Sequence, residues 1–332
     1  MGDAFLFAAN SVLPIIILIA LGYFLKRIKL LTKEFLDVGN KLTFRVLLPV
    51  MLFVNVYSID RITDINIVFV LYGVVGVFAV FLLGTAVTCA FTKDSAKRGT
   101  LIQAIFRSNY AIIGIPLAAS LFGDKGAAAA GVMSAFCVPL FNILAVVTLT
   151  IFNGSAEKHT VDVKKVLLGV VKNPLIIGTV MGLVCLGIRE LFVMGNIAFR
   201  LSDVTIVYKS LENVKAICTP FALIVLGGKF EFSAVPKLRN EIIFGTVLRT
   251  VGVPLLGLSA AYIFRDAFAL GGEHFAAYVG VFATPVAVSS AIMAKEMGAD
   301  DELAGQLVVW TSLVSTLTIF AIVTALVMLG IF

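Results

Sequence analysis

Ten apolar runs follow one another along this 332-residue chain, and each is long enough to cross the roughly 30 Å hydrocarbon core of a bilayer. Backbone inside lipid must find its hydrogen bonds within the protein, which favours helices. With 60% hydrophobic and 14% charged residues, the composition excludes an ordinary soluble domain. The sequence therefore predicts an all-α polytopic membrane protein with ten transmembrane helices. The runs cover roughly residues 5–25, 36–58, 65–91, 99–121, 126–152, 166–188, 211–228, 241–264, 275–294 and 304–331.

The fourth and ninth runs contain residues that do not suit a continuous helix in lipid. The fourth carries Asn109 and Pro116, and the ninth carries Thr284 and Pro285. Proline has no N–H, so the carbonyl four residues earlier loses its helical partner. We expect each helix to break at its proline and to restart there, with Thr284 suited to cap one of the restarts.

Two interrupted spans in corresponding halves of a membrane chain are typical of a transporter's binding site. A helix that restarts inside the membrane presents unpaired N–H groups and the positive end of its dipole, which together attract an anion. A simple proline kink is the alternative interpretation of either break alone. Two matched breaks with polar neighbours favour the binding site.

The chain divides into residues 1–152 and 166–332, two sets of five spans joined by a cytoplasmic loop at 153–165. An odd number of spans per set inserts the second set upside down, which predicts two inverted repeats whose broken fourth and ninth helices cross. Prolines recur at similar offsets in the two sets. The matched prolines are Pro14, Pro49 and Pro116 in the first set and Pro174, Pro220 and Pro285 in the second.

Loop charge predicts the orientation in the plasma (inner) membrane. The loops expected in the cytoplasm hold about twice as many Lys and Arg residues as the opposite loops. Both termini are therefore expected outside the cytoplasm. The region 190–212 is amphipathic, interspersed with charge, and fits an interfacial helix before the seventh span.

The ionisable residues deep in the predicted spans are basic, and no Asp or Glu lies deeper than about a turn or two from a span end. The basic residues are Arg45, Arg107, Lys172 and Arg249. Positive side chains and helix ends without fixed negative partners predict a site for an anion. The alternative is that these long side chains extend to water at the membrane surface. This alternative carries more weight for Lys172 and Arg249, which lie nearer the ends of their spans, than for Arg107.

Asn109 is the first candidate ligand residue, because its amide can both donate to and accept from a substrate. Tyr110 adds a phenol and an aromatic face beside it. Asn55 and Asn142 are weaker, since a lone buried Asn more often bonds a neighbouring helix. The candidate substrate-binding residues are Arg107, Asn109, Tyr110, Ile115, Pro116, Thr284, Pro285, Val286 and Ser289, with Asn55 added.

Other features narrow the function. The four cysteines and two histidines are scattered, which predicts neither a metal site nor disulfides, and we expect no cofactor. No phosphate loop or nucleophile with a base appears, so an enzyme is not expected. The net charge of +6 lies in short loops, where topology explains it better than nucleic acid does. The expected partners are a small organic anion and the lipid bilayer, with a homodimer left open.

Small residues are dense in several spans. Gly178 and Gly182 are spaced by four residues, and residues 127–131 hold four alanines and a glycine. We expect both stretches to mediate close helix packing.

At this point the sequence resembles the auxin efflux carrier family, which holds the plant PIN auxin transporters and many short bacterial proteins. The resemblance runs over most of the chain. The matching motifs are Asn109 with Gly114-Ile115-Pro116-Leu117, Thr284-Pro285 with Ala294-Lys295-Glu296, Lys172-Asn173-Pro174, Leu48-Pro49 with Phe53, and Arg249 with Gly252-x-Pro254.

The resemblance implies a scaffold of helices 1, 2, 6 and 7, a moving transport domain of helices 3–5 and 8–10, and elevator-like alternating access. Asn109 would contact the substrate carboxylate, and Pro116 and Pro285 would mark the crossover. The long hydrophilic loop of the plant carriers is absent, Ser108 replaces their Pro, and Val286 replaces their Gln. These departures argue against auxin itself.

A small organic anion such as malonate, malate or an auxin-like acid is the expected substrate, because short bacterial relatives are associated with such carboxylates. Two alternatives stay open. One is a sodium- or proton-coupled symporter or exchanger of related fold. The other is a membrane sensor or channel.

Overall fold

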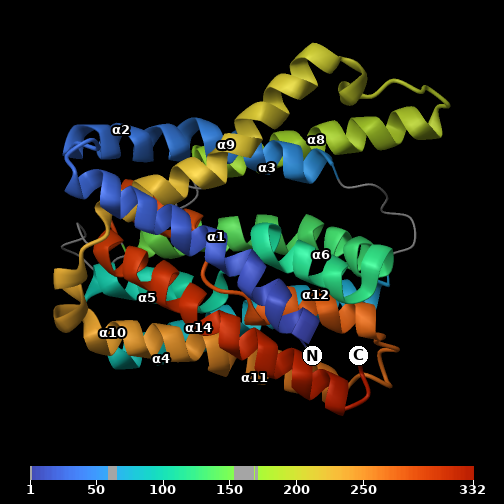
Figure 1. Cartoon of the computed structure of the whole chain (residues 1–332). Helices are drawn as coiled ribbons and strands as arrows, with labels where there is room; N and C mark the ends of the chain where they lie inside the picture. The colour runs from blue at the N-terminus through green and yellow to red at the C-terminus, as the bar shows by residue number, and fades with distance from the viewer. Residues whose placement is uncertain (1, 59–65, 153–167, 169–170) are drawn as a thin grey trace.

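The computed structural model describes residues 2–58, 66–152, 168 and 171–332, and their regular structure is helical (Figure 1). Within these ranges the single exception is an isolated β-bridge. The connecting loop predicted at 153–165 lies outside the described residues. The helices are α1 (Gly2–Arg27), α2 (Lys33–Leu42), η1 (Thr43–Leu47), α3 (Leu48–Tyr57), α4 (Ile67–Phe91), α5 (Ser95–Phe106), η2 (Tyr110–Gly114), α6 (Ile115–Ile151), α8 (Pro174–Met194), η3 (Leu201–Asp203), α9 (Thr205–Lys229), η4 (Phe232–Ala234), α10 (Val235–Val247), η5 (Leu248–Gly252), α11 (Val253–Ile263), α12 (Gly272–Ala283), α13 (Ser289–Glu296) and α14 (Asp301–Met328).

Polar residues start several helices at the membrane ends. The side chain of Asn173 accepts a hydrogen bond from the Leu175 N–H at the start of α8. Asp94 and Asp300 do the same for α5 and α14. A side-chain acceptor satisfies one of the N–H groups that a helix start leaves unpaired, which fixes where the span begins.

Three of the prolines sit just after a π-helical turn. Pro49, Pro116 and Pro254 each lie at the second residue of the α-helix that follows η1, η2 or η5. In η2 the Ile115 N–H donates to the carbonyl of Tyr110, five residues back. Because the wider turn lets the backbone bond around the missing proline N–H, the helix continues. The predicted break at Pro116 is therefore wrong: the helix runs through it.

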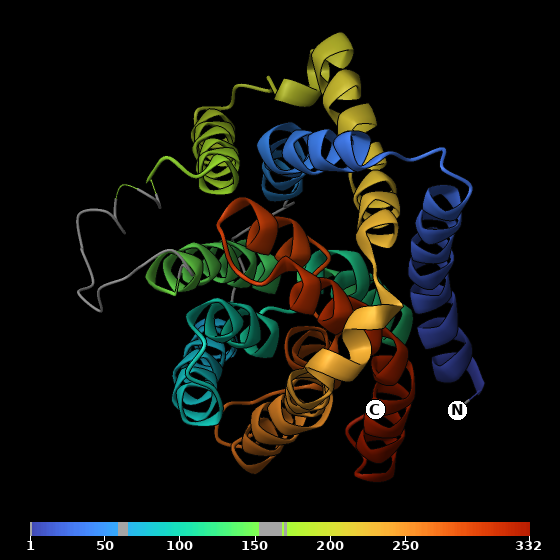
Figure 2. The ribbon, with the colours of Figure 1, turned by 90° about the vertical axis from the view of Figure 1, so that its left-hand side faces the viewer.

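The helices pack into two groups. The first group contains α1, α2, η1, α3, α8 and α9, which contact one another closely. The second contains α4, α5, η2, α6, α10, η5, α11, α12, α13 and α14. Figure 2 shows most of these helices close to end-on, with α1, α2 and α9 to the upper right of the second group. Contacts of α14 with α1 and of α13 with η1 join the two groups. We call the region where the groups meet the boundary.

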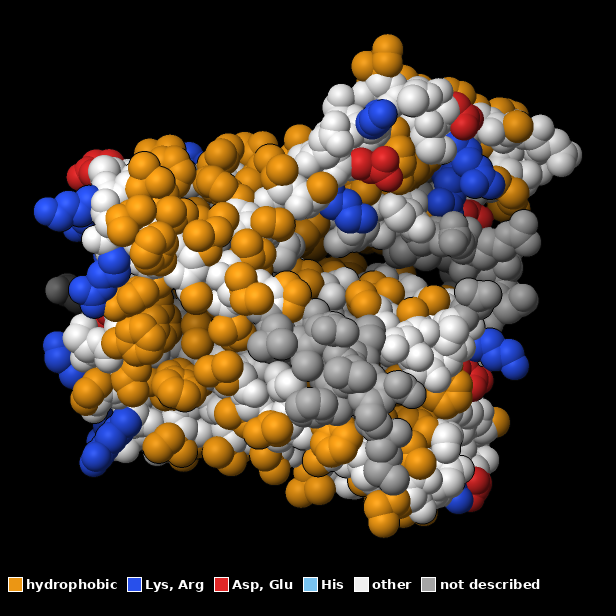
Figure 3. Space-filling view, in the orientation of Figure 1, with side chains coloured by type: hydrophobic (Ala, Val, Ile, Leu, Met, Phe, Trp, Pro, Cys, Tyr) orange, Lys and Arg blue, Asp and Glu red, His pale blue; other side chains and the backbone are white. Residues whose placement is uncertain are grey.

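Six helices in the described ranges are long and apolar enough to cross a membrane. They are Ile67–Phe91, Lys125–Ile151, Pro174–Met194, Thr205–Lys229, Phe232–Ile263 and Asp301–Met328. The predicted first, second, fourth and ninth runs are not among these six, so the full set of ten spans stays a prediction. The fourth and ninth runs are each divided into short helices. Hydrophobic side chains cover the middle of the molecule's side, and Lys and Arg gather at its ends (Figure 3).

Two local predictions differ from the structure. Helix α8 continues to Met194 and α9 already begins at Thr205, so the region 190–212 consists of these two helix ends and the three-residue turn η3 rather than one interfacial helix. The fourth and fifth predicted runs meet inside α6, where Gly123 has a φ of +56°. That left-handed conformation suits glycine, and it turns the chain between the two runs.

The predicted glycine packing is confirmed in α8. A Cβ on Gly178 would lie 2.4 Å from the Pro49 carbonyl oxygen, and one on Gly182 would lie 2.9 Å from that of Phe53. Both glycines therefore let α8 approach α3 closely. In residues 127–131 the prediction holds for Ala130, which is buried in the core, but not for Ala127, Ala128 and Gly131, which border a cavity.

Substituting Gly178 tests this packing. We expect Gly178→Ala to destabilise the protein by about 1–3 kcal/mol, because the new methyl group overlaps the α3 backbone. Gly187→Ala on the same helix should not destabilise, since nothing lies within 4 Å of Gly187. Thermal unfolding midpoints in detergent measure both, and equal midpoints for the two variants would contradict the prediction.

Candidate functional site

The two interrupted spans pair with each other through their backbones. The chain leaves the helix between Phe106 and Tyr110 and again between Ala283 and Ser289. The Asn109 N–H donates to the Pro285 carbonyl at 2.8 Å. The Ala287 N–H donates to the Arg107 carbonyl at 3.4 Å, and residues 108 and 286 form an antiparallel bridge. Backbone groups that lose helical partners therefore find them in the other interruption.

Two glycines let the interrupted helices meet. A Cβ on Gly280 of α12 would lie 2.9 Å from the Gly114 Cα of η2. The ring of Tyr110 covers both glycines and would be 2.7 Å from a Cβ on Gly114. Any larger residue at either glycine would therefore separate the helices or displace this ring.

The prolines and Thr284 have roles other than those predicted. Helix α13 restarts at Ser289, not at Pro285, and its first residue has no side-chain cap. The Thr284 hydroxyl donates to the Gly280 carbonyl at 2.7 Å, so it ends α12 rather than starting α13. The reason is that a paired extended stretch needs several residues, which moves the restart beyond the proline.

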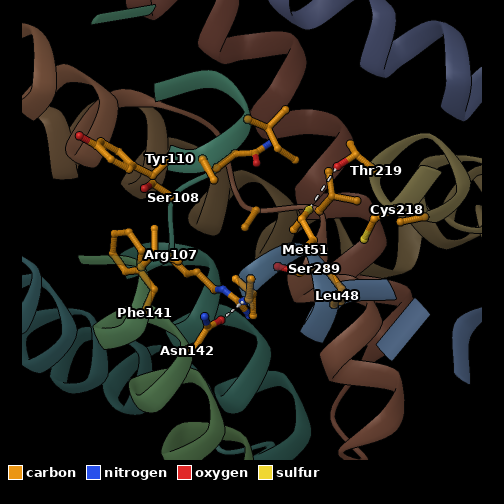
Figure 4. Close-up of a pocket in the computed structure, with 18 residues that line it drawn as sticks. Leu48, Met51, Arg107, Ser108, Tyr110, Phe141, Asn142, Cys218, Thr219 and Ser289 are labelled. Carbon is orange, nitrogen blue, oxygen red and sulfur yellow. Dashed lines mark hydrogen bonds between the residues drawn. The ribbon is translucent and has the colours of Figure 1, made fainter. Parts of the chain in front are cut away.

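A cavity of about 60 Å³ lies beside this crossing, between the two helix groups (Figure 4). A space of this size holds a few water molecules or one small ligand. The interruptions and α6 supply its polar wall, and α3 and α9 supply much of its apolar wall. The lining residues are Leu48, Met51, Leu52, Arg107, Ser108, Asn109, Tyr110, Ala111, Ile112, Val138, Phe141, Asn142, Cys218, Thr219, Ala222, Ala287, Val288 and Ser289.

Arg107 is a buried cation in this cavity, with 4% of its surface exposed. One guanidinium nitrogen donates to the Asn142 Oδ1 at 2.7 Å, and another contacts the Met293 sulfur. Figure 4 shows the side chain directed toward Asn142. Among the described residues no carboxylate forms an ion pair with it. A buried charge with neutral partners is costly and favours binding of a counter-charge.

Unpaired polar side chains line the same cavity as this guanidinium. The amide nitrogens of Asn109 and Asn142 and the hydroxyl of Ser108 are buried and have no hydrogen-bond partner in the protein. All three side chains line the cavity. Buried polar groups are normally satisfied, so this cluster indicates a place for a ligand or water. Donors beside a cation suit the oxygens of an anion.

Other predicted ligand residues lie near this cavity without presenting polar atoms to it. The Tyr110 hydroxyl donates to the Ala130 carbonyl at 3.1 Å, and in Figure 4 its ring is directed away from Met51. Val286 is buried, with its N–H bonded to the Thr311 hydroxyl at 3.1 Å. Ser289 does line the cavity. Of the predicted set, Arg107, Asn109 and Ser289 thus offer polar side chains there.

Ile115, Pro116 and Asn55 line a second, wider cavity of about 950 Å³. It shares Met51, Ala111, Ile112, Val138 and Thr219 with the first, so the two adjoin. Arg200 and Lys215 also line it, and among the described residues no Asp or Glu does. Figure 3 shows a hollow between the two groups on the side of the molecule where both termini lie. We call this cavity the vestibule.

Polar contacts join the two groups at the opposite end of the boundary. The Asn40 amide of α2 donates to the Glu296 carboxylate of α13 at 2.8 Å. The Gln306 amide of α14 donates to the Glu231 carbonyl at 2.8 Å. These contacts border a third cavity of about 140 Å³, whereas the candidate site adjoins the vestibule at the other end.

The buried-charge prediction holds for two of the four residues. Arg107 and Arg249 are buried, and Arg249 has no exposed surface. Arg45 and Lys172 are exposed, so the prediction is wrong for them. Asn142, one of the weaker candidates from the sequence, lines the cavity. The residues hardest to find from sequence are Met51 and Thr219, because only packing brings α3 and α9 to the crossing.

Comparison with known proteins identifies the family. The family model described as "Membrane transport protein" matches residues 7–323. An "Uncharacterized transporter" of Methanothermobacter thermautotrophicus is 23% identical over 323 residues, which is 95% of this chain and 97% of that protein. Together with the long apolar helices, the match identifies a multi-pass membrane protein. The chain belongs to the membrane transport protein family, whose members resemble the auxin efflux carriers.

Proposed function

We propose that this protein is a secondary transporter of a small organic anion, held at the crossing of the two interrupted spans. The observation that carries the proposal is Arg107, a buried guanidinium that lines the cavity with no carboxylate partner among the described residues. The unpaired amide nitrogens of Asn109 and Asn142 line the same cavity. A carboxylate at this place would supply the missing charge and accept from these donors.

The size and charge of the two cavities favour a small carboxylate such as malonate, malate or an auxin-like acid. The inner cavity is about 60 Å³, which admits a small group but no macromolecule. Arg200 and Lys215 give the vestibule a positive charge, which raises the local concentration of anions. The apolar side chains around the inner cavity exclude water from the bound charge.

We further propose elevator-type alternating access in a fold of ten spans, arranged as two inverted repeats. The first helix group would be the scaffold and the second the transport domain. The inner cavity lies between them and adjoins the vestibule, and contacts of Asn40 and Gln306 join the groups at the other end. If the loop charges set the orientation, both termini and the vestibule face the outside of the plasma membrane.

Coupling to a cation at the breaks is less well supported than anion transport alone. Sodium would need backbone carbonyls at the interruptions. Those of Ile105, Val281 and Thr284 already accept hydrogen bonds from the guanidinium of Arg249. A second cation there would meet a fixed positive charge.

Replacing Asn109 tests the ligand amide. We expect Asn109→Ala to slow the transport of labelled malonate, malate or aromatic carboxylates in proteoliposomes by roughly tenfold or more, because a hydrogen bond to a charged group is lost. Asn240→Ala, at an exposed position of α10, is the matched control. Equal rates for the two variants would remove Asn109 from the mechanism.

Replacing Arg107 separates binding from folding. We expect Arg107→Met to abolish the thermal stabilisation that an organic acid gives the purified protein, because the counter-charge is gone. The unfolding midpoint without ligand should stay the same or rise, since an uncompensated buried charge is removed. Arg45→Met removes an exposed cation and should keep the ligand effect. An undiminished ligand effect in Arg107→Met would refute the assignment.

A crosslink tests whether the two groups move. Cysteines placed by Asn40→Cys and Glu296→Cys and joined by a short reducible crosslinker should stop transport, and reduction should restore it. The control pair is Asp37→Cys with Lys229→Cys, which lies within the first group, where the native side chains are 2.8 Å apart. Transport that continues in the crosslinked 40–296 protein would rule out relative motion there.

A further inference from the structure

Arg249 donates hydrogen bonds to backbone carbonyls through three of its nitrogens. It lies in η5, between α10 and α11, and is fully buried. Its Nε donates to the Thr284 carbonyl at 2.8 Å, its Nη1 to the Ile105 carbonyl at 3.0 Å and its Nη2 to the Val281 carbonyl at 3.1 Å. All three hydrogen bonds therefore go to backbone.

These carbonyls belong to the ends of the two helices that stop at the crossing. Ile105 is next to the last residue of α5, and Val281 and Thr284 lie at the end of α12. The last carbonyls of a helix have no partner within it. A continued helix would bond Val281 to residue 285, but Pro285 has no N–H. A continued helix would bond Ile105 to the Asn109 N–H, which instead donates to Pro285.

One guanidinium thus satisfies both helix ends at once. Each end carries the negative pole of its helix dipole, and a cation placed there is favourable. The planar fork of arginine presents several N–H groups in fixed directions, which suits three carbonyls from two chain segments. A lysine ammonium is a single point and cannot reproduce this geometry.

We infer that Arg249 is a positioning residue, which clamps the ends of α5 and α12 together and so fixes the paired stretches that carry Arg107 and Asn109. It does not line the cavity, so it would not touch the substrate. The two buried arginines have separate tasks: Arg107 faces the ligand space with neutral side-chain partners, and Arg249 fastens backbone. The ligand role of this crossing rests on the proposed function, but the clamp itself does not.

Hydrogen–deuterium exchange on the protein without any added anion tests the clamp directly. In Arg249→Met the amides of Asn109 and Ala287, which bond across the crossing, should exchange roughly tenfold faster or more. Exchange in α4 and α8 should stay unchanged. Arg249→Lys keeps the charge but not the fork, and should also exchange faster at the crossing, by a smaller factor.

Arg98 supplies a matched control. It also donates to carbonyls at a helix end, to Thr92 at 2.6 Å and to Cys89 at 3.1 Å, beyond and within the last turn of α4. Arg98→Met should loosen that end and leave the crossing unchanged. Wild-type exchange at residues 109 and 287 in the Arg249 variants would overturn the inference, and so would acceleration spread evenly over the whole protein. If Arg249→Met does not fold, Arg249→Lys decides by the same criteria.

Ligand binding gives a second readout, with malonate and an aromatic carboxylate as the probes. Arg249→Lys should weaken their binding in the wild-type background. In the Asn109→Ala background it should change binding by less than about twofold, because the two residues act through one crossing. Equal weakening in both backgrounds would contradict positioning. If neither probe binds the unsubstituted protein, the proposed substrate class fails, while the exchange experiment still decides the clamp.

Discussion

Backbone inside a membrane must find a hydrogen-bond partner within the protein, and the crossing of the two interrupted spans follows from that constraint. Residues 107–109 and 285–287 leave the helix and bond to each other through the Asn109 N–H and the Pro285 carbonyl. Arg249 takes the carbonyls that remain. The close approach of Gly114 and Gly280 makes these contacts possible. Irregular backbone at this depth therefore exists because it is buried in protein beside a cavity.

The same arrangement supports the proposal that the cavity binds an anion. Arg249 neutralises the negative ends of α5 and α12, so no negative pole is left exposed there. Arg107 keeps its charge uncompensated inside the cavity, with unpaired donors from Asn109 and Asn142. Arg249 is therefore held by backbone carbonyls, whereas Arg107 remains available to a ligand. Because the cavity lies between the two helix groups, a bound anion would sit where relative motion of the groups changes its access.

Proline has a different effect in this fold from the one that its chemistry alone predicts. Pro116 lacks an N–H, yet the chain stays helical, because η2 widens by one residue and keeps its backbone bonds. Pro49 and Pro254 follow π-turns in the same way. Pro285 does lie in a break. Its carbonyl accepts a hydrogen bond from the Asn109 N–H, and the next helix does not start at this proline. The chemistry of proline alone shows that the helix is disturbed at such a position. It does not show whether the turn widens or the helix breaks.

The sequence by itself determined the membrane class, the family motifs and the presence of two interruptions, because hydrophobic length and helix-breaking chemistry are local properties. It also indicated Asn109 and Arg107, because burying a polar side chain within a membrane span is costly unless the side chain bonds to the protein or to a ligand. Only the tertiary structure decided that Arg107 faces a cavity while Arg249 fastens backbone, and that Arg45 and Lys172 are exposed. Those distinctions depend on which distant segment lies within about 3 Å of a side chain, and packing alone fixes that.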